Sequence, residues 1–127
     1  MSAARFVATN NRGTELVVGS DSSEFTPIEL LLAAIAACTG LDVDALTTRR
    51  AEPDSFELLA TADKVRDEHG NHLQDIEVVF RVAFPDGEGG DAARDLLPEA
   101  IKRSHDGLCT VSRTVELGTP VASVIAD

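Results

Sequence analysis

Apolar and polar positions at the start of the chain predict a β-hairpin. Residues 4–8 and 14–18 are mostly apolar, and the Asn-Asn-Arg-Gly run at 10–13 between them suits a tight turn. Residues 19–25 are rich in serine and acidic side chains and show no periodicity, which predicts a loop.

A long apolar helix is predicted to follow this loop. Thr26 has the properties of an N-cap, Pro27 suits the first helical position, and Glu29 completes a capping box with Thr26. We expect the helix to run to about residue 50. Small residues around Gly40 predict that another helix lies close, and in so short a chain that helix could come from a second subunit. An apolar stripe at intervals of three and four predicts that Cys38 points into the core; it comprises Leu31, Ala34, Cys38, Leu41 and Ala45.

Two further segments, 54–65 and 73–84, predict a second antiparallel hairpin. In the later segment apolar side chains alternate with charged ones, which is typical of a strand with one face in the core. Pro85 and Gly87 then end the strand.

The last third of the chain predicts helices and a closing strand. The helical pattern starts at residue 91 and ends near residue 105 or 107, and Pro98 predicts a kink or a fresh start. A short helical turn is expected after Cys109, and residues 119–125 read as a β-branched strand. The whole pattern predicts a single α+β domain spanning residues 1–127.

Composition and charge argue against two classes of function, nucleic-acid binding and a role in a membrane. The 11 lysines and arginines stand against 22 acidic residues, a net charge of −11, so the chain would repel a nucleic-acid backbone. The longest apolar stretch, residues 30–38, is too short to span a bilayer, so no membrane role is expected. Residues 1–13 lack the features of a secretory signal, which predicts a cytoplasmic protein.

Two cysteines, Cys38 and Cys109, carry the candidate chemistry. In a reducing compartment they are expected to be free thiols or a catalytic couple, not a structural bridge, although a buried cysteine also packs well as a small apolar residue. A zinc site of both cysteines and one histidine is disfavoured because no metal-ligand spacing supports it, so we expect neither metal nor cofactor. The histidines are His69, His72 and His105.

Two motifs resemble the OsmC/Ohr family of hydroperoxide-reducing proteins. They are PIELLLAAIAACTGLDVDAL, which contains Cys38, and GLCTVSRTVELGTPV, which contains Cys109. The resemblance implies the OsmC-like fold, with antiparallel sheets wrapped around a long central helix in an intertwined homodimer. It also implies a thiol-dependent peroxidase that acts in oxidative or osmotic stress defence on organic hydroperoxides, or on hydrogen peroxide.

The same resemblance assigns roles to individual residues. Cys38 would attack the peroxide, Cys109 would resolve the sulfenic acid as a disulfide, and an external dithiol would regenerate the pair. Family peroxidases also use an arginine and a glutamate beside the attacking cysteine, for which Arg12 and Glu29 are the nearest candidates. Ile28 occupies the usual glutamate position, and Glu29 has a sufficient role in the capping box. A non-enzymatic relative that binds an apolar small molecule in the dimer pocket is the alternative.

Overall fold

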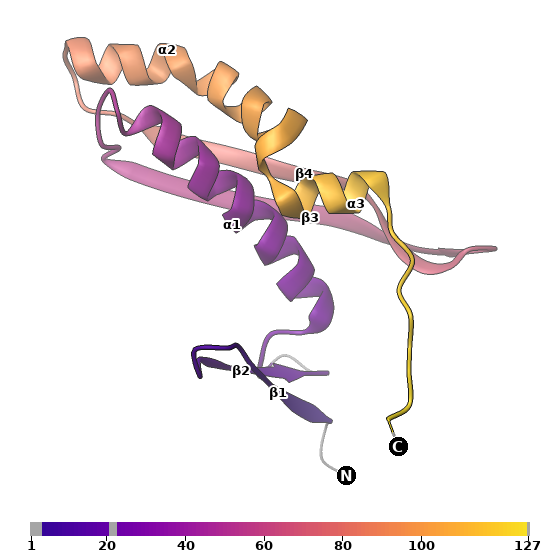
Figure 1. Cartoon of the computed structure of the whole chain (residues 1–127). Coiled ribbons are helices and arrows are strands. Elements are labelled where there is room, and N and C mark those ends of the chain that lie inside the picture. Colours follow the sequence, from indigo (N-terminus) through magenta and orange to yellow (C-terminus); the bar gives the residue numbers. More distant parts are fainter. Residues whose placement is uncertain (1–3, 21–22, 127) are drawn as a thin grey trace. The chain divides into compact units, whose positions relative to one another are not determined.

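The computed structural model describes residues 4–20 and 23–126, and these form three α-helices, one π-helical turn and four strands (Figure 1). Their contacts divide the chain into two compact units, Met1–Ala34 and Ile35–Asp127. We describe each unit by itself. Helices and antiparallel sheets together confirm the α+β class. The single domain over residues 1–127 stays a prediction.

The first unit contains the predicted N-terminal hairpin. Strands β1 (Arg5–Thr9) and β2 (Glu15–Gly19) pair antiparallel. The Asn10 side-chain oxygen accepts hydrogen bonds from the backbone N–H groups of Arg12 and Thr14, at 2.9 and 3.0 Å, and so shapes the turn. Gly13 has a φ of 86°, a conformation in which glycine avoids the strain of a side chain.

Helix α1 (Pro27–Thr47) begins where the capping box predicted. The Glu29 carboxylate accepts from the Thr26 N–H at 2.9 Å, and the Thr26 hydroxyl accepts from the Glu29 N–H at 3.3 Å. The helix ends at Thr47, three residues before the predicted end.

The predicted buried stripe of α1 was wrong. Leu41 is 71% exposed and Leu31 is 40% exposed, and Cys38 is half-buried. Because α1 is apolar on nearly every face, its own composition does not select the side that is covered. The buried positions are Ile35, Ala36, Thr39, Gly40, Val43 and Thr47.

Gly40 lies on the face of α1 that meets the second hairpin. A Cβ added at Gly40 would lie 2.5 Å from Leu58 Cδ1, so a larger residue there would require the Leu58 side chain to move. By length and mean hydropathy α1 could also cross a membrane, a test that the core helix of a soluble protein passes equally well.

Strands β3 (Ser55–Asp67) and β4 (Gly70–Ala83) form the second predicted hairpin. Exposed and half-buried residues alternate along most of both strands, which confirms that one face is covered. The register shifts between Thr61 and Asp63, and opposite this point Asp75 has a positive φ of 54°. This irregularity lies within an otherwise continuous ladder.

The C-terminal helices differ from prediction in their boundaries. Helix α2 (Glu88–Arg103) begins three residues early and runs through Pro98, so the fresh start at Pro98 was wrong. The π-helical turn η1 (Ser104–Leu108) follows, and then helix α3 (Thr110–Leu117), which confirms a helix after Cys109.

The closing strand predicted at 119–125 was also wrong. Residues 119–126 are extended without regular structure (Figure 1), and Val121, Val124 and Ile125 are each at least 86% exposed. A strand requires a partner for its backbone groups, and no described strand pairs with this segment.

Candidate functional site: the Cys38–Cys109 pair

The fold brings together the two cysteines, which are far apart in the sequence. Both are free thiols, and the Sγ atoms of Cys38 and Cys109 and a carboxylate oxygen of Asp42 lie within 4.8 Å of one another. Both cysteines belong to the second unit. The pairing that the family resemblance implied is therefore possible within one chain.

The turn η1 delivers Cys109 to this position. The Cys109 N–H donates to the Ser104 carbonyl at 2.8 Å, a bond across five residues, and Cys109 then leaves the helical conformation with a ψ of 99°. It becomes the N-cap of α3. Single π-turns of this kind frequently occur at functional sites, where they redirect one side chain.

The start of α3 favours a thiolate at Cys109. Its Sγ lies 3.4 Å from the Ser112 backbone nitrogen and 3.2 Å from the Ser112 hydroxyl oxygen. Burial raises the pKa of the Cys109 thiol, but hydrogen bonds with the Ser112 side chain, the Ser112 amide and Cys38 together leave that pKa below its ordinary value.

The pKa of the Cys38 thiol is shifted in the opposite direction. A backbone hydrogen bond from Val111 lowers its pKa, but burial, the bond to Cys109 and the negative charges of Cys109 and Asp42 together raise that pKa above its ordinary value. The reduced pair therefore favours a proton on Cys38 and a thiolate on Cys109.

Hydrogen bonds among three polar side chains connect the two elements that carry the cysteines. Ser104 is fully buried, and its hydroxyl donates to an Asp42 carboxylate oxygen at 2.8 Å while lying 2.8 Å from the Thr39 hydroxyl. Because Thr39 and Asp42 lie one and four residues after Cys38 on α1, these bonds join the helix that carries Cys38 to the turn that precedes Cys109. Together they fix the two cysteines relative to each other.

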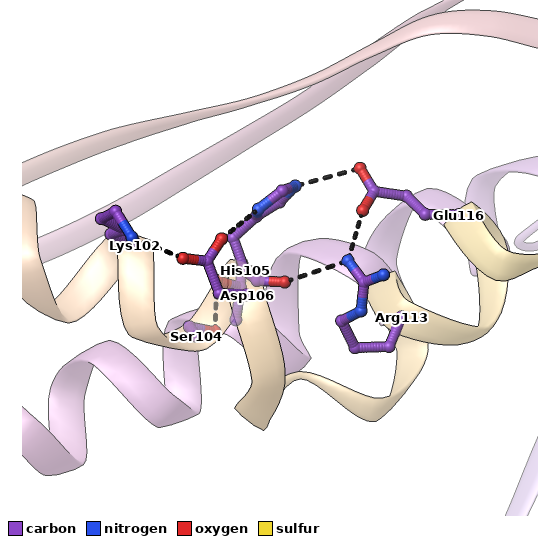
Figure 2. A network of polar contacts seen from close by, with 7 residues as sticks. Lys102, Ser104, His105, Asp106, Arg113 and Glu116 are labelled. Carbon is purple, nitrogen blue, oxygen red and sulfur yellow. Dashed lines mark hydrogen bonds and ion pairs between the residues drawn. The ribbon is translucent and has the colours of Figure 1, made fainter.

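A surface network ties η1 to α3 (Figure 2). Glu116 lies between His105, at 3.0 Å, and Arg113, at 2.6 Å, while Asp106 contacts both His105, at 3.2 Å, and Lys102, at 2.7 Å. Hydrogen bonds to Glu116 and Asp106 raise the pKa of His105, and the bond to His105 lowers the pKa of Glu116. The network thus helps to orient α3, the helix that Cys109 caps.

A pocket of about 430 Å³ lies beside residues that neighbour the two cysteines, although neither cysteine lines it. Ser112 lines this pocket and also contacts Cys109, and Thr39, the residue after Cys38, lines it too. Its apolar lining comprises Ile35, Ile76, Val78, Phe80, Ile101 and Val115. Its polar lining comprises Thr39, Gln74, Asp75, His105, Ser112 and Glu116. The pocket is therefore mixed in character, and Ser112 is the lining residue that contacts a cysteine.

The other two predicted site residues belong to the first unit. The Arg12 backbone N–H bonds to Asn10 in the exposed hairpin turn, and the Glu29 carboxylate is engaged with Thr26. Of the four site residues predicted from the sequence, the structure brings Cys38 and Cys109 together. The roles of Arg12 and Glu29 stay predictions.

Sequence reasoning missed the residues that surround the pair. It did not identify Asp42, Ser104 or Ser112 as neighbours of the two cysteines. The Ser112 contact had a detectable signal, since an N-cap side chain usually accepts from the amide three positions later. The Asp42–Ser104 bond had none, because its two residues come from different elements.

Sequence comparison finds relatives that match nearly the whole chain. The chain is 31% identical to an uncharacterized protein of Mycobacterium tuberculosis over 125 residues, which cover 97% of this chain and 89% of the relative. The same figures hold for an uncharacterized protein of Mycobacterium bovis.

Solved structures show the same fold. An OsmC-like protein of unknown function from Vibrio cholerae superposes with a TM-score of 0.74 at 14% identity, over 88% of this chain and 79% of that one. The organic hydroperoxide resistance protein OhrB of Bacillus subtilis gives 0.51 at 17% identity, over 90% of each chain. Residues 19–124 match the sequence profile of the OsmC-like proteins, and the chain belongs to this family.

Proposed function

We propose that the protein is a dithiol peroxidase that reduces organic hydroperoxides. The observation that carries this proposal is the approach of two free thiols, Cys38 and Cys109, to within 4.8 Å of each other. A disulfide needs a separation of about 2.05 Å between the sulfur atoms, so the two sulfurs must approach each other further when the bond forms.

The proposed reaction has two steps. The Cys38 sulfur attacks the distal oxygen of the hydroperoxide, the O–O bond breaks, and the products are the alcohol and Cys38 sulfenic acid. The Cys109 sulfur then attacks the sulfenic sulfur, a disulfide forms, and water leaves. One hydroperoxide and two thiols thus give one alcohol, one water and one disulfide, and an external dithiol reduces the disulfide by exchange.

The difference in solvent access supports the attacking role that we propose for Cys38. Cys109 is fully buried, whereas Cys38 is half-buried. Because Cys109 carries the more acidic thiol, it is the ionised member of the reduced pair and can take up the Cys38 proton as Cys38 attacks. It then passes this proton to the departing alkoxide, which forms the alcohol and restores the Cys109 thiolate for the second step. Cys38 thus provides the accessible sulfur, and Cys109 provides the ionised group that handles the proton.

The pocket supports an organic substrate. Its apolar side chains suit the hydrocarbon part of a hydroperoxide, and Ser112 connects it to the cysteine pair. Hydrogen peroxide would gain nothing from such a surface.

Further parts of the proposal follow from the family. We propose a cytoplasmic homodimer, which would cover apolar side chains of the first hairpin such as Phe6, 73% exposed. Arg12 is proposed as the cation that approaches Cys38, and Glu29 is proposed to act as a helix cap.

A free-thiol count tests the proposal. Reduced protein in the presence of a metal chelator is treated with one equivalent of cumene hydroperoxide and then titrated with a thiol reagent. The wild type should lose two thiols per chain, and Cys38→Ser should lose none. Ala37→Ser makes a matched change at the neighbouring exposed position of α1 and should react like the wild type. Equal thiol loss in wild type and Cys38→Ser would refute the proposal.

The pocket also supports a second candidate, a non-enzymatic protein that binds an apolar small molecule. Its volume and lining alone would suffice for that function. Saturable binding of an apolar fluorescent probe, together with no thiol loss on peroxide treatment, would favour it over the peroxidase.

A further inference from the structure

We propose that the reduced cysteine pair and Asp42 form a Zn²⁺ site that oxidation of the pair dismantles. The metal would take three ligands from the chain, namely the sulfurs of Cys38 and Cys109 and one carboxylate oxygen of Asp42. A water molecule would complete the tetrahedron. The inference concerns the same cysteines as the proposed peroxidase, but binding itself does not depend on peroxidase activity.

The distances suit a metal of this size. Zn–S bonds of about 2.3 Å at a tetrahedral angle hold two sulfurs about 3.8 Å apart. The three ligand atoms already lie within 4.8 Å of one another, so they need to approach by about 1 Å or less. Two thiolates select a thiophilic cation such as Zn²⁺ over Mg²⁺ or Ca²⁺.

Charge also favours a cation at this position. With both thiols ionised, the three groups would carry three negative charges in a half-buried space. No lysine, arginine or histidine of the described residues 35–126 forms an ion pair with Asp42. A divalent cation would relieve this repulsion directly.

Each ligand is held by a second residue, as metal ligands usually are. Ser104, fully buried, donates to one oxygen of Asp42 at 2.8 Å. The Ser112 N–H lies 3.4 Å from the Cys109 sulfur, and Val111 contributes a backbone hydrogen bond to Cys38. The three ligands thus come from two elements that these bonds already hold in place.

Oxidation would remove two ligands in one event. When a hydroperoxide oxidises the zinc-bound pair, two protons are taken up, and the products are the disulfide, the alcohol, water and free Zn²⁺. Bound zinc would in turn protect the thiols and slow their reaction with peroxide. The site would therefore bind metal only while the pair is reduced.

The test is a Zn²⁺ titration of reduced, metal-free protein without oxygen or peroxide, in competition with a chromophoric chelator. We expect one Zn²⁺ per chain, no such binding by the disulfide form, and recovery after reduction. Asp42→Asn should weaken binding at least about tenfold. Asparagine retains an acceptor for Ser104, so the variant should keep its fold. Asp44→Asn, two residues later on α1 and bonded to Thr48, is the matched control and should bind as the wild type does.

Substitution by Co²⁺ gives a second readout. Thiolate-to-cobalt charge-transfer absorption should appear in the wild type and fall in Cys38→Ser and Cys109→Ser. Ser104→Ala leaves all three ligands in place and should weaken Zn²⁺ binding less than Asp42→Asn. Equal affinity of wild type and Asp42→Asn, or zinc binding by the disulfide form as tight as by the reduced form, would overturn the site. Thiol loss measured with chelator is a separate result, so either proposal can fail alone.

Discussion

Cys38 and Cys109 lie close together, but their surroundings differ in kind. Cys38 sits in the middle of α1, half-buried, beside the carboxylate of Asp42, and its pKa is raised. Cys109 caps α3, is fully buried, contacts Ser112 through two groups, and its pKa is lowered. Cys109 is therefore the more acidic thiol, and Cys38 is the more accessible one.

This division shows how two positions in the fold treat the same side chain. Backbone N–H groups within α1 are used by the helix itself, so Cys38 receives its backbone hydrogen bond from Val111 in the first turn of α3, whereas Cys109 receives hydrogen bonds from both the amide and the hydroxyl of Ser112. A thiolate is therefore stabilised at the terminus and must be generated by proton transfer in the interior. The following experiments test that difference, beginning with the largest expected effect.

Replacing Cys109 by serine should separate the two steps of the proposed reaction. Cys38 would still be oxidised, but its sulfenic acid would have no resolving thiol and should persist. Trapping with dimedone and mass spectrometry should give nearly one adduct per chain in Cys109→Ser, at least about tenfold more than in the wild type. Adduct formation on Cys109 in Cys38→Ser would instead reverse the assignment of attacker and resolver.

Removing the Ser112 hydroxyl should bring the pKa of Cys109 closer to that of Cys38. Ser112→Ala keeps the backbone amide but loses the side-chain hydrogen bond, so the pKa of Cys109 should rise and its thiolate population near neutral pH should fall about tenfold. Thiolate absorbance against pH, measured in the Cys38→Ser background, reports this change. Ser112→Thr retains the hydroxyl and should restore the lower pKa. An unchanged titration in Ser112→Ala would show that the amide alone sets the pKa.

The cap of α1 should affect stability without changing the chemistry of Cys38. Thr26→Ala removes half of the capping box and should cost about 1 kcal/mol in urea unfolding. Glu29→Gln retains the capping hydrogen bond but removes the charge, so its rate of thiol loss should match that of the wild type. A large fall in that rate would give Glu29 a catalytic role beside Cys38.

The network around His105 should have the smallest effect, confined to the Cys109 side. The raised pKa of His105 means that its pairing stabilises the fold below pH 6.5, its ordinary value, and is lost as pH rises through the folded-state pKa. The lowered pKa of Glu116 means that its contribution holds above 4.5 and is lost as pH falls. The pairing is thus strongest between these values.

Glu116→Gln should therefore move the pKa of His105 back toward 6.5. An NMR titration of the imidazole measures this directly. Glu57→Gln alters an exposed pair with Arg81 on β3 and β4 and should leave His105 unchanged. An unaltered titration in Glu116→Gln would assign the shift to Asp106 instead.

Local signals predicted most of the fold. Both hairpins, the start of α1 and the helix after Cys109 follow from turn residues, alternation and capping, which act within a few residues. The predictions failed where the answer depends on distant parts of the chain. The face of α1 that is buried depends on Leu58 meeting Gly40, and residues 119–125 form no strand because no described strand pairs with them.

The sequence by itself determined which residues could carry chemistry, because the two cysteines stand in recognisable family motifs. Only the tertiary structure decided that they meet, that Asp42 joins them, and that Ser112 makes Cys109 the more acidic thiol. The physical reason is that a pKa depends on burial, hydrogen-bond donors and charges within a few ångströms. Those neighbours come from segments whose proximity no local pattern encodes.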